Sequence, residues 1–232
     1  MKRRQLPRVK ILNKKFELLL RCFVLDSTAT YTSKFVELNR KTINRIYTLL
    51  RHTIFAYVSP DEYEKLEGDI ELDESYFGAT RVRGKRGRGA HGKTIVFGLL
   101  KRNGKVYTKI LTNVSKAEIL PILKRKVLNT LESNIYTDGF KSYDSLVDLG
   151  FKHHRILHSE DQFAEGSNHI NGIESFWAYA KHRLSKFKGF KKNLFYLHLK
   201  ETEWRFNNRH LTIDEQLKLI KSLVKQYQKK KS

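Results

Sequence analysis

The sequence changes its hydrophobic pattern once, near residue 70, and this change limits the chain to a mixed architecture. Up to about residue 55 the apolar residues recur at helical spacing, and no segment alternates as a strand would. From Ile70 onward, short apolar segments separated by turn residues predict strands. The predicted order is βββαβαβα, which implies an α/β fold with a mixed five-stranded sheet and helices on both faces.

Five strands and three helices are predicted in this part of the chain. The strands are predicted at 70–77, 94–100, 106–111, 134–137 and 151–157, and the helices at 115–128, 143–149 and 172–187. Arg102, Asn103 and Gly104 form a hairpin signal between the second and third strands. We therefore expect one sheet-containing domain at 68–192, followed by a helical extension at 193–232.

The first 58 residues are predicted to form a separate helical module. Helices are expected at 11–25, at 27–36 with Ser27 as cap, and onward from a cap at Asn39. The polar face of the third helix carries Arg40, Lys41, Asn44 and Arg45. Two short helices, a tight turn and a basic third helix are typical of a helix-turn-helix that enters the major groove of DNA. An ordinary three-helix bundle with a solvated basic face is the alternative.

The charge balance points to a polyanionic partner. The chain has 46 Lys and Arg residues against 24 Asp and Glu residues, a formal net charge of +22. Such an excess attracts nucleic acid. A basic protein of the ribosomal kind would usually carry its charge on low-complexity tails, whereas here 40% hydrophobic and 12% aromatic residues can fill a core.

The cysteine and hydropathy patterns exclude several classes of protein. Cys22 is the only cysteine, which rules out an internal disulfide and a zinc site built from cysteine pairs. The longest apolar stretch, at 16–25, contains Glu17 and Arg21 and is too short to span a bilayer. We therefore expect a cytoplasmic protein with no membrane partner.

A glycine-rich basic loop is predicted between the first and second strands. Six basic residues and four glycines lie between positions 81 and 93, without one acidic residue. The basic residues are Arg81, Arg83, Lys85, Arg86, Arg88 and Lys93. A flexible cationic loop of this kind is expected to bind phosphates. A solvated loop without a role is the alternative.

Three acidic residues lie where a nuclease site would need them. Phosphodiester cleavage uses divalent ions that carboxylates from separate elements hold together. Asp73 lies inside the first predicted strand, where an uncompensated charge is costly, and Asp138 ends the fourth. Glu174 opens the helix at 172–187, and Lys181 follows roughly 10 Å along the same side. Taken singly, the acids also have ordinary interpretations as an ion-pair partner, a turn residue and a first-turn helix charge.

Taken together, the motifs carry a resemblance to a known family. The motifs are Leu-Asp-Glu-Ser-Tyr-Phe-Gly around Asp73, Tyr-Thr-Asp-Gly around Asp138, and Asn-Gly-Ile-Glu-Ser-Phe-Trp around Glu174. Thirty-five residues separate Asp138 from Glu174. From about residue 70 to 209, the chain resembles the DDE transposases of small bacterial insertion sequences, of the ISXO type in the RNase H-like superfamily.

The resemblance implies a catalytic site and its partners. Asp73, Asp138 and Glu174 would bind two Mg²⁺ ions, for which Mn²⁺ could substitute, and Lys181 would complete the set as a basic residue near phosphate. Water would cut DNA at the element ends, and the freed 3′-hydroxyl would then attack target DNA. The implied partners are double-stranded DNA, as terminal inverted repeats and as target, and a second copy of the chain in a homodimer. The implied location is the bacterial nucleoid.

Two other functions stay open on the sequence alone. A metal-dependent resolvase or ribonuclease could use the same fold, although it needs no module that reads repeats. A catalytically silent DNA-binding protein derived from a transposase could keep the fold, although the acidic set is intact. Relatives often carry a cysteine-rich zinc ribbon, which this sequence cannot form. Of the histidines His153, His154, His158 and His169, which lack the pattern of a zinc site, His169 stands just before the catalytic helix as in the family.

Overall fold

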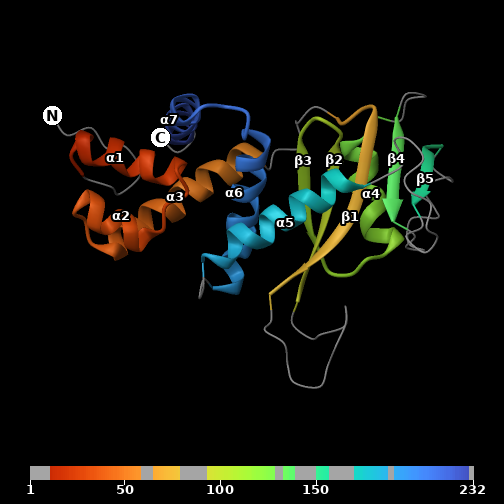
Figure 1. Cartoon of the computed structure of the whole chain (residues 1–232), viewed down its shortest axis with the longest axis horizontal. Helices are drawn as coiled ribbons and strands as arrows, with labels where there is room; N and C mark the ends of the chain where they lie inside the picture. Colours follow the sequence, from red (N-terminus) through yellow and green to blue (C-terminus); the bar gives the residue numbers. More distant parts are fainter. Residues whose placement is uncertain are drawn as a thin grey trace, which may run out of the picture. The chain divides into compact units, whose positions relative to one another are not determined.

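The computed structural model describes residues 11–58, 65–78, 93–128, 133–138, 150–156, 170–187 and 191–229. It divides into two compact units. Residues Asp61–His182 form the sheet unit, and Met1–Pro60 together with Arg183–Ser232 form the helical unit (Figure 1). The C-terminal helices therefore group with the N-terminal ones, whereas the sequence pattern had divided the chain at 58, 68 and 193.

The helical unit contains two groups of helices that are far apart in the sequence. The first group is α1 (Asn13–Val24), α2 (Ala29–Val36) and α3 (Arg40–Val58), and the second is the 3₁₀ turn η2 (Lys192–Leu194), α6 (Phe195–Asn207) and α7 (Ile213–Lys229). Helix α3 packs against both α6 and α7, and α1 packs against α7. None of the described helices combines the length and the hydropathy that crossing a membrane would require.

The caps of α2 and α3 were predicted with mixed success. Asn39 begins α3 as expected, because its Oδ1 accepts a hydrogen bond from the backbone N–H of Lys41 at 2.8 Å. The prediction of Ser27 for α2 was wrong: the cap is Thr28, whose hydroxyl accepts from the N–H of Tyr31 at 3.3 Å. The backbone N–H of Ser27 instead bonds to Cys22 at the end of α1, so residue 27 belongs to the preceding turn. Either residue type can cap a helix, and the end of the preceding helix decides which one does.

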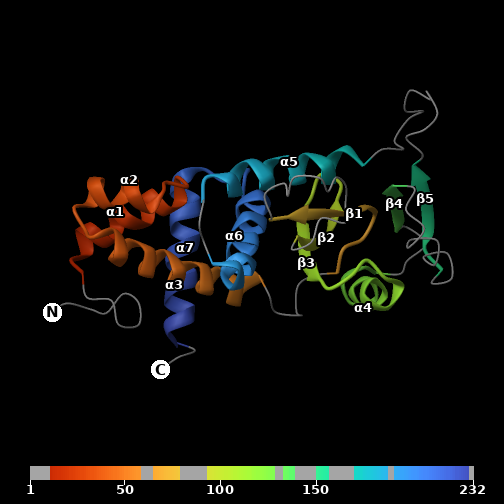
Figure 2. The same ribbon diagram turned by 90° about the horizontal axis from the view of Figure 1, so that it is seen from below.

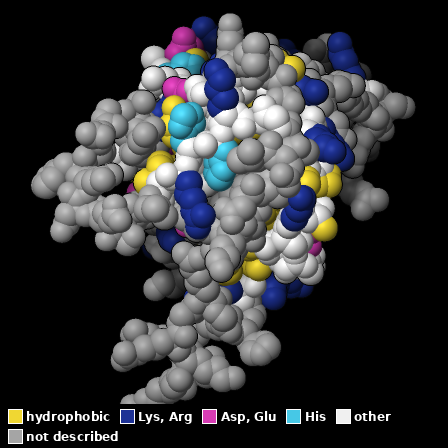
Figure 3. Space-filling model, turned by 90° about the vertical axis from the view of Figure 1, so that its right-hand side faces the viewer, with side chains coloured by type: hydrophobic (Ala, Val, Ile, Leu, Met, Phe, Trp, Pro, Cys, Tyr) yellow, Lys and Arg dark blue, Asp and Glu magenta, His cyan; other side chains and the backbone are white. Residues whose placement is uncertain are grey.

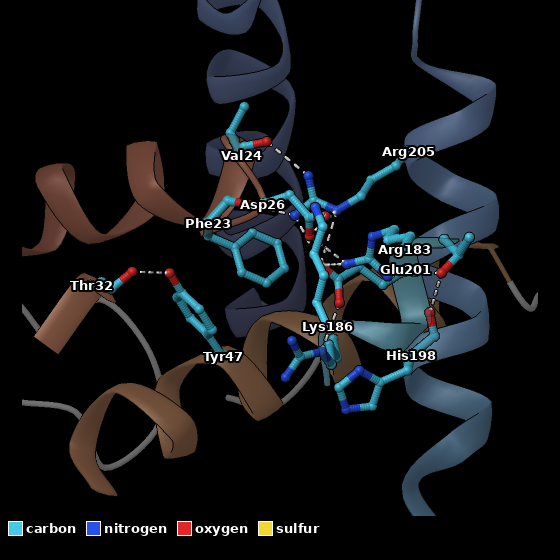
Figure 4. A network of polar contacts seen from close by, with 12 residues as sticks. Phe23, Val24, Asp26, Thr32, Tyr47, Arg183, Lys186, His198, Glu201 and Arg205 are labelled. Carbon is cyan, nitrogen blue, oxygen red and sulfur yellow. Dashed lines mark hydrogen bonds and ion pairs between the residues drawn. The ribbon is translucent and has the colours of Figure 1, made fainter. Parts of the chain in front are cut away.

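A buried polar network connects four segments of the helical unit (Figure 4). Its centre is Glu201 of α6, whose side chain is 1% exposed. The carboxylate forms ion pairs with Arg51 of α3 at 2.7 Å, with Arg183 at 2.6 Å and with Arg205 of α6 at 2.8 Å. Arg183 also bonds to Asp26, just after α1, at 2.7 Å. Buried charges need such mutual pairing, because each one alone would lose its hydration without compensation.

The sheet unit contains one mixed five-stranded sheet with the order β3-β2-β1-β4-β5. The strands are β1 (Asp69–Phe77), β2 (Thr94–Lys101), β3 (Val106–Leu111), β4 (Asn134–Asp138) and β5 (Lys152–Ile156). The first three are antiparallel neighbours, and β4 and β5 run parallel to β1. The predicted α/β fold class, a mixed five-stranded sheet flanked by helices, is confirmed. The predicted helix at 143–149 lies outside the described residues.

Helices lie on both faces of this sheet (Figure 2). On one face, α4 (Lys116–Lys126) places Ile119 and Leu123 in a core cluster with Leu72 and Leu99 of the central strands. On the other face, α5 (Asn171–Ser185) packs so closely that a Cβ on Gly98 of β2 would lie 2.6 Å from the Trp177 ring. A glycine at this position is therefore required by the approach of α5.

Candidate functional site

Asp73 and Asp138 lie on neighbouring parallel strands at the same level. Leu72 of β1 pairs with Thr137 of β4, so Asp73 and Asp138 are the next residues along each strand. Residues in register on parallel strands point to the same face of a sheet. The negative charge of Asp138 is close enough to raise the pKa of Asp73. The structure therefore brings two of the three predicted acids together.

Asp73 is held by two donors and is difficult to ionise. Its Oδ1 accepts from the backbone N–H of Glu74 at 2.8 Å, and its Oδ2 accepts from the indole N–H of Trp177 at 3.0 Å. Burial, together with the negative charges of Glu74 and Asp138, raises the pKa of Asp73 to about 7, although the two hydrogen bonds act to lower it. A cation beside this carboxylate would favour its charged form.

Helix α5 covers the face on which the two aspartates lie. The contact with Asp73 comes from Trp177, and the Trp177 ring also meets Phe77 of β1 edge-on, with ring centroids 6.0 Å apart. The residues that form the apolar stripe of this helix, Ile173, Phe176, Trp177, Ala180 and Leu184, are all buried. These contacts fix which side of α5 faces the sheet.

Glu174 and Lys181 lie along the exposed side of the same helix. Glu174 is in the first turn of α5, and its backbone N–H bonds to the carbonyl of Ile170 at 3.2 Å. Both side chains are exposed. Seven residues place Lys181 two helical turns beyond Glu174, about 10 Å along the axis. The third acid is thus carried by the helix that packs on the aspartate face, one residue after the buried Ile173.

The three acids are not gathered into a metal centre in the part of the chain that the structure describes. No group of three or more His, Cys, Asp or Glu side chains among those residues could hold a metal ion. The donor chemistry nevertheless fits a hard divalent cation, because two carboxylates lie together and one of them is desolvated. Glu74 is buried and follows Asp73 in the strand, so its side chain points to the opposite face of the sheet.

Sequence reasoning missed one residue on the aspartate face. Glu71 lies two residues before Asp73 and therefore on the same face, and its side chain is 1% exposed. It bonds to Arg102 and to the first turn of α5. The sequence offered one signal for it, an acid two residues before Asp73 with apolar residues on either side, which is the spacing of two side chains on one face of a strand.

The residues predicted to contact DNA divide between described and undescribed parts of the chain. Arg40, Lys41, Asn44 and Arg45 lie in α3, and all four side chains are exposed. Glu37, between α2 and α3, has the left-handed φ of 53° that a tight turn between helices uses. The predicted phosphate-binding residues Arg81, Arg83, Lys85, Arg86 and Arg88 lie outside the described residues, as do His158 and His169.

Two histidines of β5 are engaged within the sheet. His153 shares a hydrogen bond with the Thr137 hydroxyl at 2.8 Å, and His154 stacks on Tyr136 with ring centroids 4.9 Å apart. The side of the molecule on which β5 lies shows Lys and Arg side chains more often than acidic ones over its described surface (Figure 3). Lys152 and Arg155 of β5 are exposed. Charged residues on an edge strand also oppose its pairing with another chain.

Comparison with known protein families agrees with this arrangement. The model of the ISXO2-like transposase domain matches residues 65–207, which include the whole described sheet together with α5 and α6. The chain therefore belongs to the ISXO2-like transposase family. The predicted membership of an insertion-sequence transposase family is confirmed.

Individual relatives extend the comparison. A transposase-like protein of Haemophilus influenzae is 50% identical over 121 residues, which cover 52% of this chain and 94% of that protein. A protein in the transposable element ISH50 of Halobacterium salinarum is 29% identical over 174 residues, 68% of this chain and 57% of its own length. This chain thus spans little more than half of the Halobacterium protein.

Solved structures show more distant similarity. The catalytic core domain of BIV integrase is 14% identical, with a TM-score of 0.38, over 59% of this chain and 81% of that one. A Mos1 strand transfer complex is 15% identical, with a TM-score of 0.31, over 87% of this chain and 78% of that one.

Proposed function

We propose that this transposase binds the ends of its element and cuts and joins DNA with the site formed by Asp73, Asp138 and Glu174. The observation that carries the proposal is the pair of adjacent aspartates on one sheet face, covered by the helix that bears Glu174. Asp73 and Asp138 would hold divalent cations from the sheet, and Glu174 would complete the set from α5. Two Mg²⁺ ions, or Mn²⁺ in their place, would stabilise the attacking and leaving oxygens of an in-line displacement.

The chain's own residues would do the rest of the work at this site. The pairing of β1 with β4 fixes the separation of the two aspartates, and the indole N–H of Trp177 holds the orientation of Asp73. Lys181, on the same exposed side of α5 as Glu174, would bind a backbone phosphate. Water attacks the phosphodiester at the element end first. The released 3′-hydroxyl then attacks the target strand, in a second displacement of the same kind.

DNA binding is assigned to two basic regions with different tasks. The exposed side chains of Arg40, Lys41, Asn44 and Arg45 on α3 can reach base edges in the major groove, as a recognition helix does. The predicted basic loop, with Arg81, Arg83, Lys85, Arg86 and Arg88, would bind phosphates without regard to sequence. Terminal inverted repeats and target DNA are the proposed partners, in the bacterial nucleoid.

A homodimer is proposed as the acting species. Two element ends must be cut and then joined to one target, and one copy of the chain contains one set of the three acids. Sizing of the protein with and without repeat DNA by light scattering tests this part of the proposal. A complex containing a single protomer on a joined product would contradict it.

The deciding experiment incubates the full chain with Mg²⁺ and DNA carrying the repeats that flank its gene. We expect cleaved ends and joined product from the wild type, and neither from Asp73→Asn, Asp138→Asn or Glu174→Gln. Repeat DNA should still bind these variants, because each removes one negative charge from a basic protein. Glu118→Gln is the matched control, since Glu118 is the first-turn acid of α4, on the opposite face of the sheet.

The outcomes separate the competing functions. Cleavage without any joined product would identify a nuclease or resolvase instead of a transposase. Specific binding to the repeats without cleavage in Mg²⁺ or Mn²⁺ would identify a DNA-binding protein that has lost its activity. Full cleavage by any of the three variants would remove that residue from the site.

A further inference from the structure

Glu71 is a buried acid that the proposed reaction does not use. It lies in β1, two residues before Asp73 and on the same face, and its side chain is 1% exposed. A carboxylate in such a place is costly unless donors and a positive charge compensate it. An apolar residue would fill the same space at lower cost, so the contacts that this acid makes need an explanation.

The first contact of Glu71 neutralises its charge. Its Oε1 accepts from the Nε–H of Arg102, in the turn after β2, at 2.9 Å. The Arg102 guanidinium itself lies over the Tyr136 ring, with its central carbon 3.8 Å from the ring centroid. Asp69, at the start of β1, lies 4.0 Å from another nitrogen of the same guanidinium. Residues of β1 and β4 therefore hold Arg102 in place against Glu71.

The second contact holds the first turn of α5. The backbone N–H of Ile173 donates to Glu71 Oε2 at 2.8 Å. The first N–H groups of a helix have no acceptor within the helix, and their partial positive charge favours an anion. Gly172 allows the approach, because a Cβ there would lie 2.8 Å from Glu71 Oε2 and 2.9 Å from Leu100 Cδ2. The next residue along the helix is Glu174.

Two tethers from one strand thus fix both the height and the rotation of α5. Glu71 binds the helix at Ile173, and Asp73 binds it one turn later at Trp177. Glu174 lies between these two points in the sequence. A rotation or a shift of α5 would move the Glu174 carboxylate relative to the aspartates, and either tether would have to break first.

We propose that Glu71 is a positioning residue, which sets Glu174 against Asp73 and Asp138 by anchoring the first turn of α5. This inference rests on the proposed function of the three acids. Glu71 contacts neither DNA nor metal in this role, and it acts through the backbone of Ile173. Displacing a catalytic group by about 1 Å can reduce a rate by about 100-fold, so a small shift of the helix is enough.

Two variants test the proposal by different routes. Glu71→Gln keeps the size of the side chain but has one acceptor oxygen where two donors converge, so the Arg102 or the Ile173 contact must be lost. Gly172→Ala leaves every charge in place and introduces a Cβ that collides with the Glu71 carboxylate and with Leu100 Cδ2. Alanine is otherwise favourable in a helix, so only the close contact can make this change harmful. Ser175→Ala, at an exposed position of the same turn, is the control for a change to alanine.

Three measurements are made on the full chain. Hydrogen exchange at the Ile173 amide should be roughly 10- to 100-fold faster in Glu71→Gln and Gly172→Ala, because its acceptor is lost or displaced. The single-turnover rate of cleavage of repeat DNA with Mg²⁺ should fall by about 10- to 100-fold. The Kd for repeat DNA, measured in EDTA, should be unchanged. A purely structural role would lower thermal stability without this split between rate and DNA affinity.

The results distinguish this inference from the proposed function. If Asp73→Asn still cleaves DNA, the proposed function fails and the role of Glu71 fails with it. If Asp73→Asn is inactive while Glu71→Gln and Gly172→Ala cleave at the wild-type rate, only the role of Glu71 is wrong. A slower rate with unchanged exchange at Ile173 would also overturn it. Should Glu71→Gln not fold, Gly172→Ala decides the question alone.

Discussion

Replacing Glu201 by Gln removes the charge at the centre of the buried network in the helical unit. Gln has the same size, but one of its terminal atoms becomes a donor that must face a guanidinium. Arg183 keeps its bond to Asp26 at 2.7 Å, and Arg205 keeps the carbonyl of Val24 at 2.8 Å, so these two arginines are partly compensated. Arg51 loses the carboxylate that accepts its Nε–H at 2.7 Å. We therefore expect the cost of breaking one buried pair, about 3–5 kcal/mol, and not three times that amount.

The assay is urea denaturation of the wild type, Glu201→Gln and a control, Glu17→Gln. Glu17 pairs with Lys221 at the surface, so the same chemical change there should cost less than about 1 kcal/mol. If the free energy of unfolding falls equally in the two variants, or by less than about 1 kcal/mol in Glu201→Gln, the central role of Glu201 is refuted.

The pH dependence provides a second check on the same variant. Burial alone would raise the pKa of Glu201, but Arg183, Arg51 and Arg205 outweigh it and hold the pKa well below its usual value. A depressed folded-state pKa contributes stability above the unfolded-state value and loses it as the pH falls towards the folded-state value. The difference between wild type and Glu201→Gln should thus be complete at pH 7 and should shrink below about pH 4.5.

Three further changes test other features. Burial and the nearby charge of Arg51 lower the pKa of His198 to about 3. The free energy of unfolding should therefore fall by up to about 1.4 kcal/mol per pH unit below pH 6.5. In His198→Gln, the free energy of unfolding measured with urea should depend less on pH between pH 6.5 and 5. An unchanged slope would contradict a neutral buried imidazole. Thr28→Ala should lower the free energy of unfolding by about 1 kcal/mol and Ser27→Ala by much less, since Thr28 caps α2. A larger loss in Ser27→Ala would show that Ser27, the cap expected from the sequence, stabilises the helix instead. Gly98→Ala should cost about 1–3 kcal/mol in thermal or urea unfolding, because the new Cβ meets the Trp177 ring at 2.6 Å; a neutral result would show that α5 can move away.

The strands could be predicted because local chemistry determines them. The segment Val106–Leu111 is both predicted and observed, and Asn103, with a φ of 56°, makes the turn that its sequence context indicated. The placement of Asp73 and Asp138 on strands of the sheet could be anticipated as well, since each lies in or at the end of a predicted strand. The positions of residues whose partners are close in sequence, or whose place follows from strand order, could thus be predicted.

The polar contacts over long sequence distances could not be predicted in the same way. Glu201 and Arg51 are 150 residues apart, and Arg205 and Val24 are 181 apart. No periodicity indicates which acid a given arginine will meet, because the pairing depends on how the helices pack in three dimensions. The spacing of Glu201 and Arg205 predicts a local pair at most, and Glu71 offered only an unexplained acid in an apolar strand.

The contact between Glu71 and Ile173 also constrains the order of folding, because 102 residues separate the two partners. During synthesis, β1 leaves the ribosome long before α5 exists. Until α5 is made, Glu71 and Asp73 lack their contacts with it, and one face of the sheet stays uncovered. Contacts of such separation form late, since a long loop has to close first. The aspartate face would therefore be completed only when α5 docks, so a nascent chain that has not reached residue 173 lacks the assembled site.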